Sequence, residues 1–210
     1  SKLKLVYRAV IRGFELTFFA IFIQHFYPWV LSSPQDARAW ALSLLSFLLL
    51  FPMFMRIPLK MPAYVHSGIK IAAYILAFVL MNKVTYANGR VFDPAFSNII
   101  ILVLANMAIF GTLAYLFTAG NRWARVGILP FVMAVFLGSN IEGSVTKAIF
   151  DFTPISWMYS FNYLKYLFIV IPGTIAGEYV YDWMKGSITL PSGKEKDKEQ
   201  KLTPFILILS

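Results

Sequence analysis

The chain has 210 residues, of which 59% are hydrophobic and 14% are charged, and its formal net charge is +9. A soluble globular domain carries about 25% charged residues, so the composition excludes an ordinary soluble domain and favours a polytopic membrane protein. The positive charge does not indicate nucleic-acid binding, because the basic residues stand in short loops between apolar runs and form no recognisable binding motif.

Six apolar segments follow one another along the chain, and each approaches the roughly 20 residues that a helix needs to cross a bilayer. We expect spanning helices at roughly residues 9–30, 37–55, 66–82, 96–117, 124–141 and 161–181. The third and fifth segments have the shortest apolar cores, so hydropathy alone does not distinguish them from buried helices. The predicted fold is an all-α transmembrane bundle of about six spanning helices.

The basic residues are concentrated in alternate loops. Of the 19 lysines and arginines, 14 fall in one set: Lys2, Lys4, Arg8, Arg12, Arg56, Lys60, Lys70, Arg122, Arg125, Lys185, Lys194, Lys196, Lys198 and Lys201. Because loops rich in Lys and Arg stay in the cytoplasm, this asymmetry predicts a cytoplasmic N-terminus. Losing one weak span would reduce the asymmetry, which supports all six.

Proline, glycine and charge mark the predicted connections. Pro52, Pro58 and Pro62 prevent one continuous helix after the second span, and Asn88-Gly89 is a turn signal before the fourth. Residues 1–183 are expected to form the bundle, 184–202 a charged cytoplasmic linker, and 203–210 the start of a further helix. We therefore expect the chain to be an internal piece of a longer membrane protein.

The end of the first span carries the pair Gln24-His25, just before the aromatic residues of an interfacial belt. Imidazole titrates near neutral pH. His25 is therefore either a proton acceptor at the outer mouth of a cavity or an interfacial side chain bonded to a neighbouring helix or to headgroup water. Near the other end, Glu15 shares a helix face with Arg12, which predicts a structural ion pair and leaves a proton relay as the alternative.

Several polar residues share the predicted depth of His25 and are candidates for one extracytoplasmic pocket. Glu142 would take part with His25 in proton transfer. Lys165 and Asn140 would hold an anion or a sugar hydroxyl, and Gln24 and Asn162 are further substrate candidates at that depth. Shared depth is the only motive for this grouping.

The predicted cytoplasmic side offers a second set of candidates. Its basic residues are either determinants of topology or ligands for a phosphate-rich coenzyme, and the coenzyme candidates are Arg56, Lys60, Arg122, Arg125 and the mid-span Asn106. An interhelical hydrogen bond is the alternative role for Asn106. Glu178 and Asp182, near the end of the sixth span, are expected to form a solvated face. No metal is expected, since the chain has no cysteine and no HExxH motif.

Four segments resemble the central helices of a bacterial membrane family, common in Bacteroidota-type bacteria, that is related to heparan-α-glucosaminide N-acetyltransferase. They are RAVIRGFELTFFAIFIQHFYP, SNIIILVLANMAIFG, ILPFVMAVFLGSNIEGS and YLKYLFIVIPGTIAGEYV. The clearest local likeness is the small-residue helix that ends at Gly173–Glu178. The resemblance covers residues 1–183 as general sequence character and not as a short diagnostic motif.

The resemblance implies an acyltransferase of the bacterial inner membrane. It would take an acetyl or other acyl group from acetyl-CoA on the cytoplasmic side and deliver it to an amine or hydroxyl of a sugar on the far side. The family's Asp–Arg-Gly motif and its proposed catalytic histidine would precede this chain, so the resemblance transfers no catalytic role to His25. The expected partners are the bilayer, the remaining helices of the longer protein and possible further copies of the same chain.

Two other functions fit the same sequence. A transporter of a small solute or glycan would use helices broken by Pro and Gly beside buried polar residues, although no internal repeat is visible. A non-catalytic membrane subunit would need no site at all.

Overall fold

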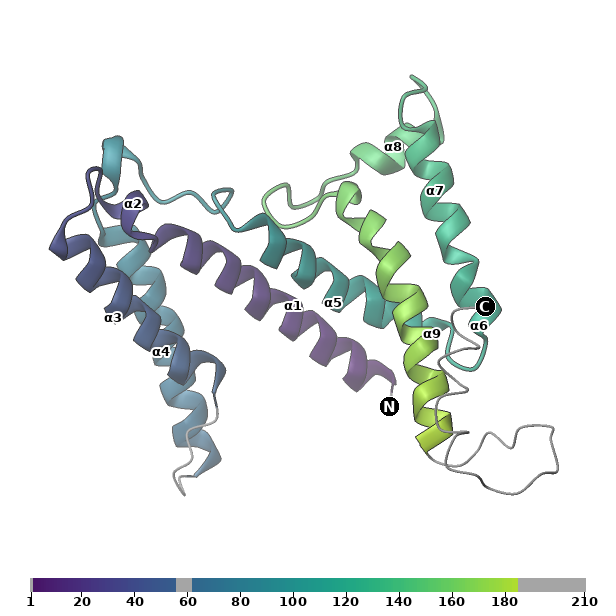
Figure 1. Cartoon of the computed structure of the whole chain (residues 1–210), viewed down its shortest axis with the longest axis horizontal. Helices are drawn as coiled ribbons and strands as arrows, with labels where there is room; N and C mark the ends of the chain where they lie inside the picture. Colours follow the sequence, from purple (N-terminus) through teal and green to yellow (C-terminus); the bar gives the residue numbers. More distant parts are fainter. Residues whose placement is uncertain (1, 56–61, 185–210) are drawn as a thin grey trace, which may run out of the picture. The chain divides into compact units, whose positions relative to one another are not determined.

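The computed structural model describes residues 2–55 and 62–184, and every regular element in these residues is a helix (Figure 1). The α-helices are α1 (Lys2–His25), α2 (Pro28–Leu31), α3 (Ala37–Phe54), α4 (Ala63–Lys83), α5 (Ile99–Phe117), α6 (Arg122–Val126), α7 (Ile128–Gly138), α8 (Val145–Asp151) and α9 (Leu167–Met184). Two short 3₁₀ helices are η1 (Ala87–Gly89) and η2 (Phe161–Tyr166). The predicted all-α class is confirmed. Arg56, Lys60, the predicted linker and the predicted final helix lie outside the described residues.

Three of the described helices are long and apolar enough to cross a membrane. They are Ala37–Phe54, Tyr64–Lys83 and Ile99–Phe117, with mean hydropathies of 1.7, 1.6 and 2.3. They match the second, third and fourth predicted spans and indicate a membrane protein. The other three predicted positions also hold helices, namely α1, the α6–α7 pair and η2 with α9.

The fifth predicted span, expected as one helix over 124–141, is divided in the structure. α6 ends at Val126, Gly127 follows as its cap, and α7 begins at Ile128. The 11 residues of α7 extend about 16 Å at 1.5 Å per residue, which is shorter than the roughly 30 Å hydrocarbon core of a bilayer. Hydropathy averaged over the segment does not reveal that the helix is interrupted at Gly127.

The chain divides into two compact units. The first, here called the histidine unit, comprises Ile11–Ala105 and Pro154–Tyr159. The second, the arginine unit, comprises the described residues within Ser1–Val10, Asn106–Thr153 and Ser160–Ser210. Each unit holds one of the polar sites described below.

In the histidine unit, α3 and α4 pack side by side (Figure 1). The face of α4 that enters the core carries Ala73, Ala77 and Met81, which are four residues apart and almost fully buried. The opposite face exposes Ile71 and Ile75. An apolar residue on an exposed face is the pattern of a helix that meets lipid, since water would favour polar side chains there.

The ends of α3 and α4 follow from capping and proline chemistry. The carboxylate of Asp36 accepts a hydrogen bond from the backbone N–H of Ala39 at 2.7 Å and so caps α3. Pro52 lies in the last turn of α3, which ends at Phe54, and Pro62 directly precedes α4. The helix therefore does not continue from α3 into α4, as predicted, and Pro58, the third predicted proline, lies outside the described residues. The predicted turn at Asn88-Gly89 is confirmed, and both of its residues have positive φ.

In the arginine unit, a glycine brings two helices into close contact. A Cβ added at Gly111 of α5 would lie 2.8 Å from Cγ1 of Val170 on α9. A separation below 3.0 Å is a clash, so only glycine fits without movement of Val170. Small residues are known to let membrane helices approach one another closely in this way.

Candidate functional site

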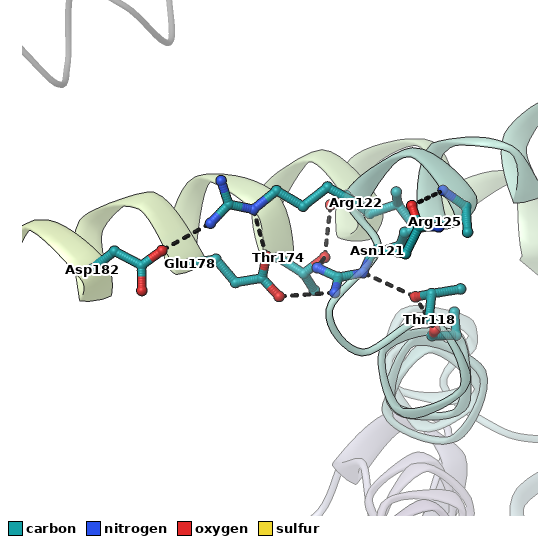
Figure 2. A network of polar contacts seen from close by, with 10 residues as sticks. Thr118, Asn121, Arg122, Arg125, Thr174, Glu178 and Asp182 are labelled. Carbon is teal, nitrogen blue, oxygen red and sulfur yellow. Dashed lines mark hydrogen bonds and ion pairs between the residues drawn. The ribbon is translucent and has the colours of Figure 1, made fainter. Parts of the chain in front are cut away.

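A network of charged residues occupies the arginine unit (Figure 2). α6 supplies Arg122 and Arg125, which lie three residues apart on one helix face. α9 supplies a stripe of polar residues at intervals of four, Thr174, Glu178 and Asp182. Asn121 accepts the backbone N–H of Ala124 at 2.9 Å and so fixes the start of α6. The two arginines of α6 and the polar stripe of α9 therefore face each other.

Arg125 is the centre of this network, and its side chain is completely buried. All three guanidinium nitrogens donate: Nε to Thr118 Oγ1 at 3.1 Å, Nη1 to Thr174 Oγ1 at 3.3 Å, and Nη2 to Glu178 Oε1 at 2.8 Å. The guanidinium also lies 4.5 Å from the ring centre of Tyr115. A buried charge is tolerated only when it is paired and hydrogen-bonded, and Arg125 satisfies both conditions.

Arg122 completes the network at its more exposed end. Its Nε donates to Glu178 Oε2 at 2.9 Å and its Nη2 to Asp182 Oδ2 at 2.8 Å, while the ring of Tyr179 lies below the guanidinium. Each oxygen of Glu178 therefore holds one arginine. The expectation that Glu178 and Asp182 form a simple solvated face is wrong. Arg122 of α6 pairs with both carboxylates, and Arg125 pairs with Glu178.

The charges of the network cancel, with two guanidinium groups against two carboxylates. A coenzyme phosphate would have to compete with these carboxylates for the same donors. The assignment of Arg122 and Arg125 to a coenzyme thus stays a prediction. Asn106, the other described coenzyme candidate, is buried in α5 with 2% of its surface exposed.

A second polar site, here called the histidine pocket, lies in the histidine unit. His25 ends α1 and is 1% exposed. Its Nδ1 donates to the carbonyl of Ile21 at 2.8 Å, and its Nε2 accepts the backbone N–H of Asp93 at 3.4 Å. Because a carbonyl can only accept, Nδ1 carries the proton and Nε2 keeps its lone pair. The contacts thus select one neutral tautomer.

The imidazole of His25 is held between aromatic rings. The ring centres of Tyr86, Phe92 and Phe96 lie 5.5, 5.1 and 5.5 Å from it. Tyr86 also donates from its hydroxyl to the carbonyl of Met81 at 2.5 Å, and burial raises the pKa of Tyr86 to about 12. The phenol therefore keeps its proton at neutral pH. Because three aromatic rings surround the imidazole of His25, that ring has little freedom to rotate.

His25 borders a cavity of about 350 Å³, which is within the usual range for small-molecule sites. Tyr86 and Phe96 line the cavity beside the histidine, while Arg90 and Asp93 are exposed at its rim. The guanidinium of Arg90 lies 5.2 Å from the ring centre of Phe96. The pocket thus combines a proton acceptor, aromatic walls and charges of both signs.

The sequence analysis found His25 but not the rest of this pocket. Tyr86, Arg90 and Asp93 fall in the predicted outer loop after the third span, on the same predicted side of the membrane as the end of the first span. That shared side is the signal that could have identified them. Gln24, a predicted substrate residue, is partly exposed next to His25 on α1.

The other predicted partners of His25 belong to the arginine unit. Glu142 is exposed and pairs with Lys147 at 3.3 Å. Asn140 is exposed after α7, and Asn162 and Lys165 are exposed on η2. Their grouping with His25 in one pocket stays a prediction.

A third charged group surrounds Glu15 of α1. The predicted ion pair is confirmed, since Arg12 Nη1 lies 3.4 Å from Glu15 Oε2. The structure adds Lys70 of α4, whose Nζ donates to the other carboxylate oxygen. Within the described parts of the chain, no group of three or more His, Cys, Asp and Glu side chains could hold a metal ion.

The family model of a domain of unknown function, DUF5009, matches residues 1–180. No curated protein and no solved structure matches the chain.

Proposed function

The chain belongs to the DUF5009 family, and on that premise we propose that it forms part of a polytopic membrane acyltransferase. The enzyme moves an acetyl group from acetyl-CoA to a hydroxyl or amine of a sugar or glycan. Three apolar helices support the membrane assignment. The resemblance of the helical segments to the family related to heparan-α-glucosaminide N-acetyltransferase supports the reaction class.

The single observation that carries this proposal is the state of His25. Acyl transfer to a hydroxyl or amine needs a group that accepts the acceptor's proton. Nε2 of His25 has a lone pair and is fixed in a neutral ring beside a cavity. Its present bond to the N–H of Asp93, at 3.4 Å, is longer than the usual 2.9–3.0 Å. A substrate O–H or N–H can therefore replace it at small cost.

The proposed reaction has two steps. Nε2 of His25 removes the proton as the acceptor oxygen or nitrogen attacks the thioester carbonyl carbon, so that a tetrahedral intermediate forms. The carbon–sulfur bond then breaks, the electron pair leaves with the sulfur, and the imidazolium returns its proton to give the free thiol of the coenzyme. The hydrogen bond from Nδ1 to the carbonyl of Ile21 stabilises the charged ring between the two steps.

The rim of the pocket supplies recognition of the acceptor. Arg90 presents an exposed guanidinium beside an aromatic ring, and Asp93 presents an exposed carboxylate. Hydrogen-bond donors and acceptors on an aromatic wall suit a sugar, whose hydroxyls are polar and whose C–H faces are apolar.

We also propose that six helices span the bacterial inner membrane, with the N-terminus in the cytoplasm. α1, the α6–α7 pair and η2 with α9 complete the set, and the asymmetry of Lys and Arg gives the orientation. The chain has no cysteine, so single cysteines report topology directly. A membrane-impermeant maleimide should label S32C and N88C from outside intact cells and N121C only after lysis. Labelling of N121C in intact cells would contradict this orientation.

The reaction is tested with the intact protein in proteoliposomes, using radiolabelled acetyl-CoA and a panel of amino sugars and glycans. H25Q should lose about 100-fold or more in kcat, the range for removal of a general base. H66Q is the matched control, because His66 is the chain's other histidine and lies away from the pocket on α4. Full activity of H25Q would overturn the role of His25. Solute counterflow without any acyl donor, by a protein that does not bind acetyl-CoA, would favour a transporter.

A further inference from the structure

A second cavity of the histidine unit runs along α1 and shares no residue with the histidine pocket. Its volume is about 310 Å³. Its apolar wall is formed by Ile11, Phe14, Phe18 and Ile21 of α1 together with Trp157. The four α1 residues follow intervals of three and four, so they form one stripe about 15 Å long. We call this cavity the α1 groove. Such a stripe fits an extended alkyl chain better than a compact polar molecule.

Charge is unevenly distributed at one end of the α1 groove. Glu15 lines the groove and is 18% exposed, and it is held by two cations, Arg12 and Lys70. The cations are 58% and 37% exposed. This group therefore carries one net positive charge on its exposed side, which an anionic headgroup can neutralise without disturbing Glu15.

A buried hydroxyl lies in the same wall. Tyr74 of α4 lines the α1 groove, and its ring packs on Phe18 with 4.9 Å between centres. Among the described residues, its Oη is the buried side-chain polar atom that has no hydrogen-bond partner. Buried polar groups are normally paired, so this donor indicates an acceptor atom that belongs to a bound molecule.

We propose that the α1 groove binds an anionic phospholipid. One acyl chain lies along the apolar stripe, the phosphate is held near Arg12 and Lys70, and an ester carbonyl accepts the hydrogen bond of Tyr74. Because α4 is apolar enough to span the membrane, the groove meets the bilayer, where such a lipid is abundant. Acyl-CoA shares the chemistry of a phosphate group on an apolar chain and is the alternative source. The proposal is independent of acyl transfer by His25.

Trp157 provides a probe inside the α1 groove. Phosphatidylglycerol and phosphatidylcholine with the same brominated acyl chains are titrated into the delipidated protein in detergent. The quenching that is lost in W157F is the signal from the groove. Phosphatidylglycerol should bind about fivefold or more tightly, in keeping with about 1 kcal/mol per basic residue near an anionic headgroup. This comparison needs no variant that alters charge.

Variants then locate the contacts. R12Q and K70Q, made singly, should each reduce the preference for phosphatidylglycerol severalfold, whereas K83Q at the other end of α4 should not. Y74F should weaken binding of both lipids about two- to tenfold without lowering the melting temperature of the delipidated protein, since the unpaired donor is removed. Y64F is its control, because Tyr64 is on the same helix and 77% exposed. I11F should narrow the groove without adding a second tryptophan and should weaken the Trp157 signal.

Three results would overturn the proposal. Equal binding of the two lipids would remove the role of the cations. Unchanged quenching in I11F would show that the lipid contacts Trp157 from outside the groove. Displacement of phosphatidylglycerol by equimolar acetyl-CoA would assign the groove to the coenzyme and not to a membrane lipid.

Discussion

The arginine network and the histidine pocket are both polar sites in an apolar chain, but they differ in how their polar atoms are used. In the network, every nitrogen of Arg125 donates to an oxygen, and both oxygens of Glu178 are occupied. In the pocket, Nε2 of His25 accepts only one long hydrogen bond, from the N–H of Asp93, and lies beside a cavity of about 350 Å³. The first site is closed and neutral, whereas the second is open.

This difference separates stability from chemistry. Removing one member of a closed network leaves a buried charge without its partner, which is costly even where the intact network contributes little net stability. Replacing a neutral base beside an open cavity with a side chain of similar size leaves no buried charge unpaired, but it takes away a proton acceptor. The arginine network should therefore respond to mutation through folding, and the histidine pocket through reaction rate.

The largest effect is expected for Glu178→Gln. The amide keeps the shape of the side chain but removes the charge that pairs with buried Arg125. The free energy of unfolding should therefore fall by about 3–5 kcal/mol. Thermal unfolding in detergent measures this change. Glu142→Gln is the matched control, because Glu142 is 90% exposed and its pair with Lys147 should contribute less than about 1 kcal/mol. Equal melting temperatures for the two variants would contradict the structural role of the network.

Gly111→Ala should be next in size. The new methyl group would lie 2.8 Å from Val170 Cγ1, and overpacking of this kind costs about 1–3 kcal/mol. Gly68→Ala on α4 is the control, since nothing lies within 4 Å of its added Cβ, and alanine should there be neutral or stabilising. Restoration of stability by the double variant G111A/V170A would confirm the contact between α5 and α9. A G111A protein as stable as G68A would rule the contact out.

Arg90→Gln should affect the open site without affecting the fold. If Arg90 recognises the acceptor, its loss removes a charged hydrogen bond worth about 1.5–3 kcal/mol, so KM for the acceptor should rise about tenfold or more while kcat changes little. K83Q, which removes a nearby exposed charge, should leave KM unchanged. A fall in kcat at constant KM would instead place Arg90 in the chemical step.

Tyr86→Phe is expected to have the smallest effect. It removes the hydrogen bond to the carbonyl of Met81, which contributes about 1 kcal/mol. The folded pKa of about 12 lies above the unfolded value of about 10. The phenol's contribution is therefore fully present below pH 10 and is lost as pH rises toward 12. The difference in melting temperature between wild type and Y86F should shrink over that pH interval. A constant difference would contradict the raised pKa of Tyr86 in the folded protein.

Local patterns predicted much of the fold. Pro52 and Pro62 ended and began helices where expected, and Asn88-Gly89 formed a turn, because each depends on the chain's own backbone preferences. The pair Arg12–Glu15 was predictable because residues three apart share a helix face. Gly127 divides the fifth predicted span, and hydropathy averaged over a window does not detect a single interruption of this kind.

Contacts between distant segments could not be predicted in the same way. Lys70 reaches Glu15 from another helix, and Arg125 reaches Glu178 across 53 positions. Periodicity identifies the face on which a residue lies but not the helix that the face meets. Trp157 shows the same limit: it lies in the loop before η2, far along the chain from α1 and α4, yet it packs against the core of the histidine unit. The pocket around His25 is assembled from a loop that carries no motif.

The most direct measurement is acetyl transfer per folded molecule for H25Q and E178Q together, with the folded fraction taken from thermal unfolding of the same samples. We predict that H25Q melts within a few degrees of wild type and loses about 100-fold or more in kcat. E178Q should melt far lower, yet its folded fraction should transfer acetyl groups at nearly the wild-type rate. The opposite pattern, an active H25Q and a stable but inactive E178Q, would place the chemistry in the arginine network and contradict the division between the two sites.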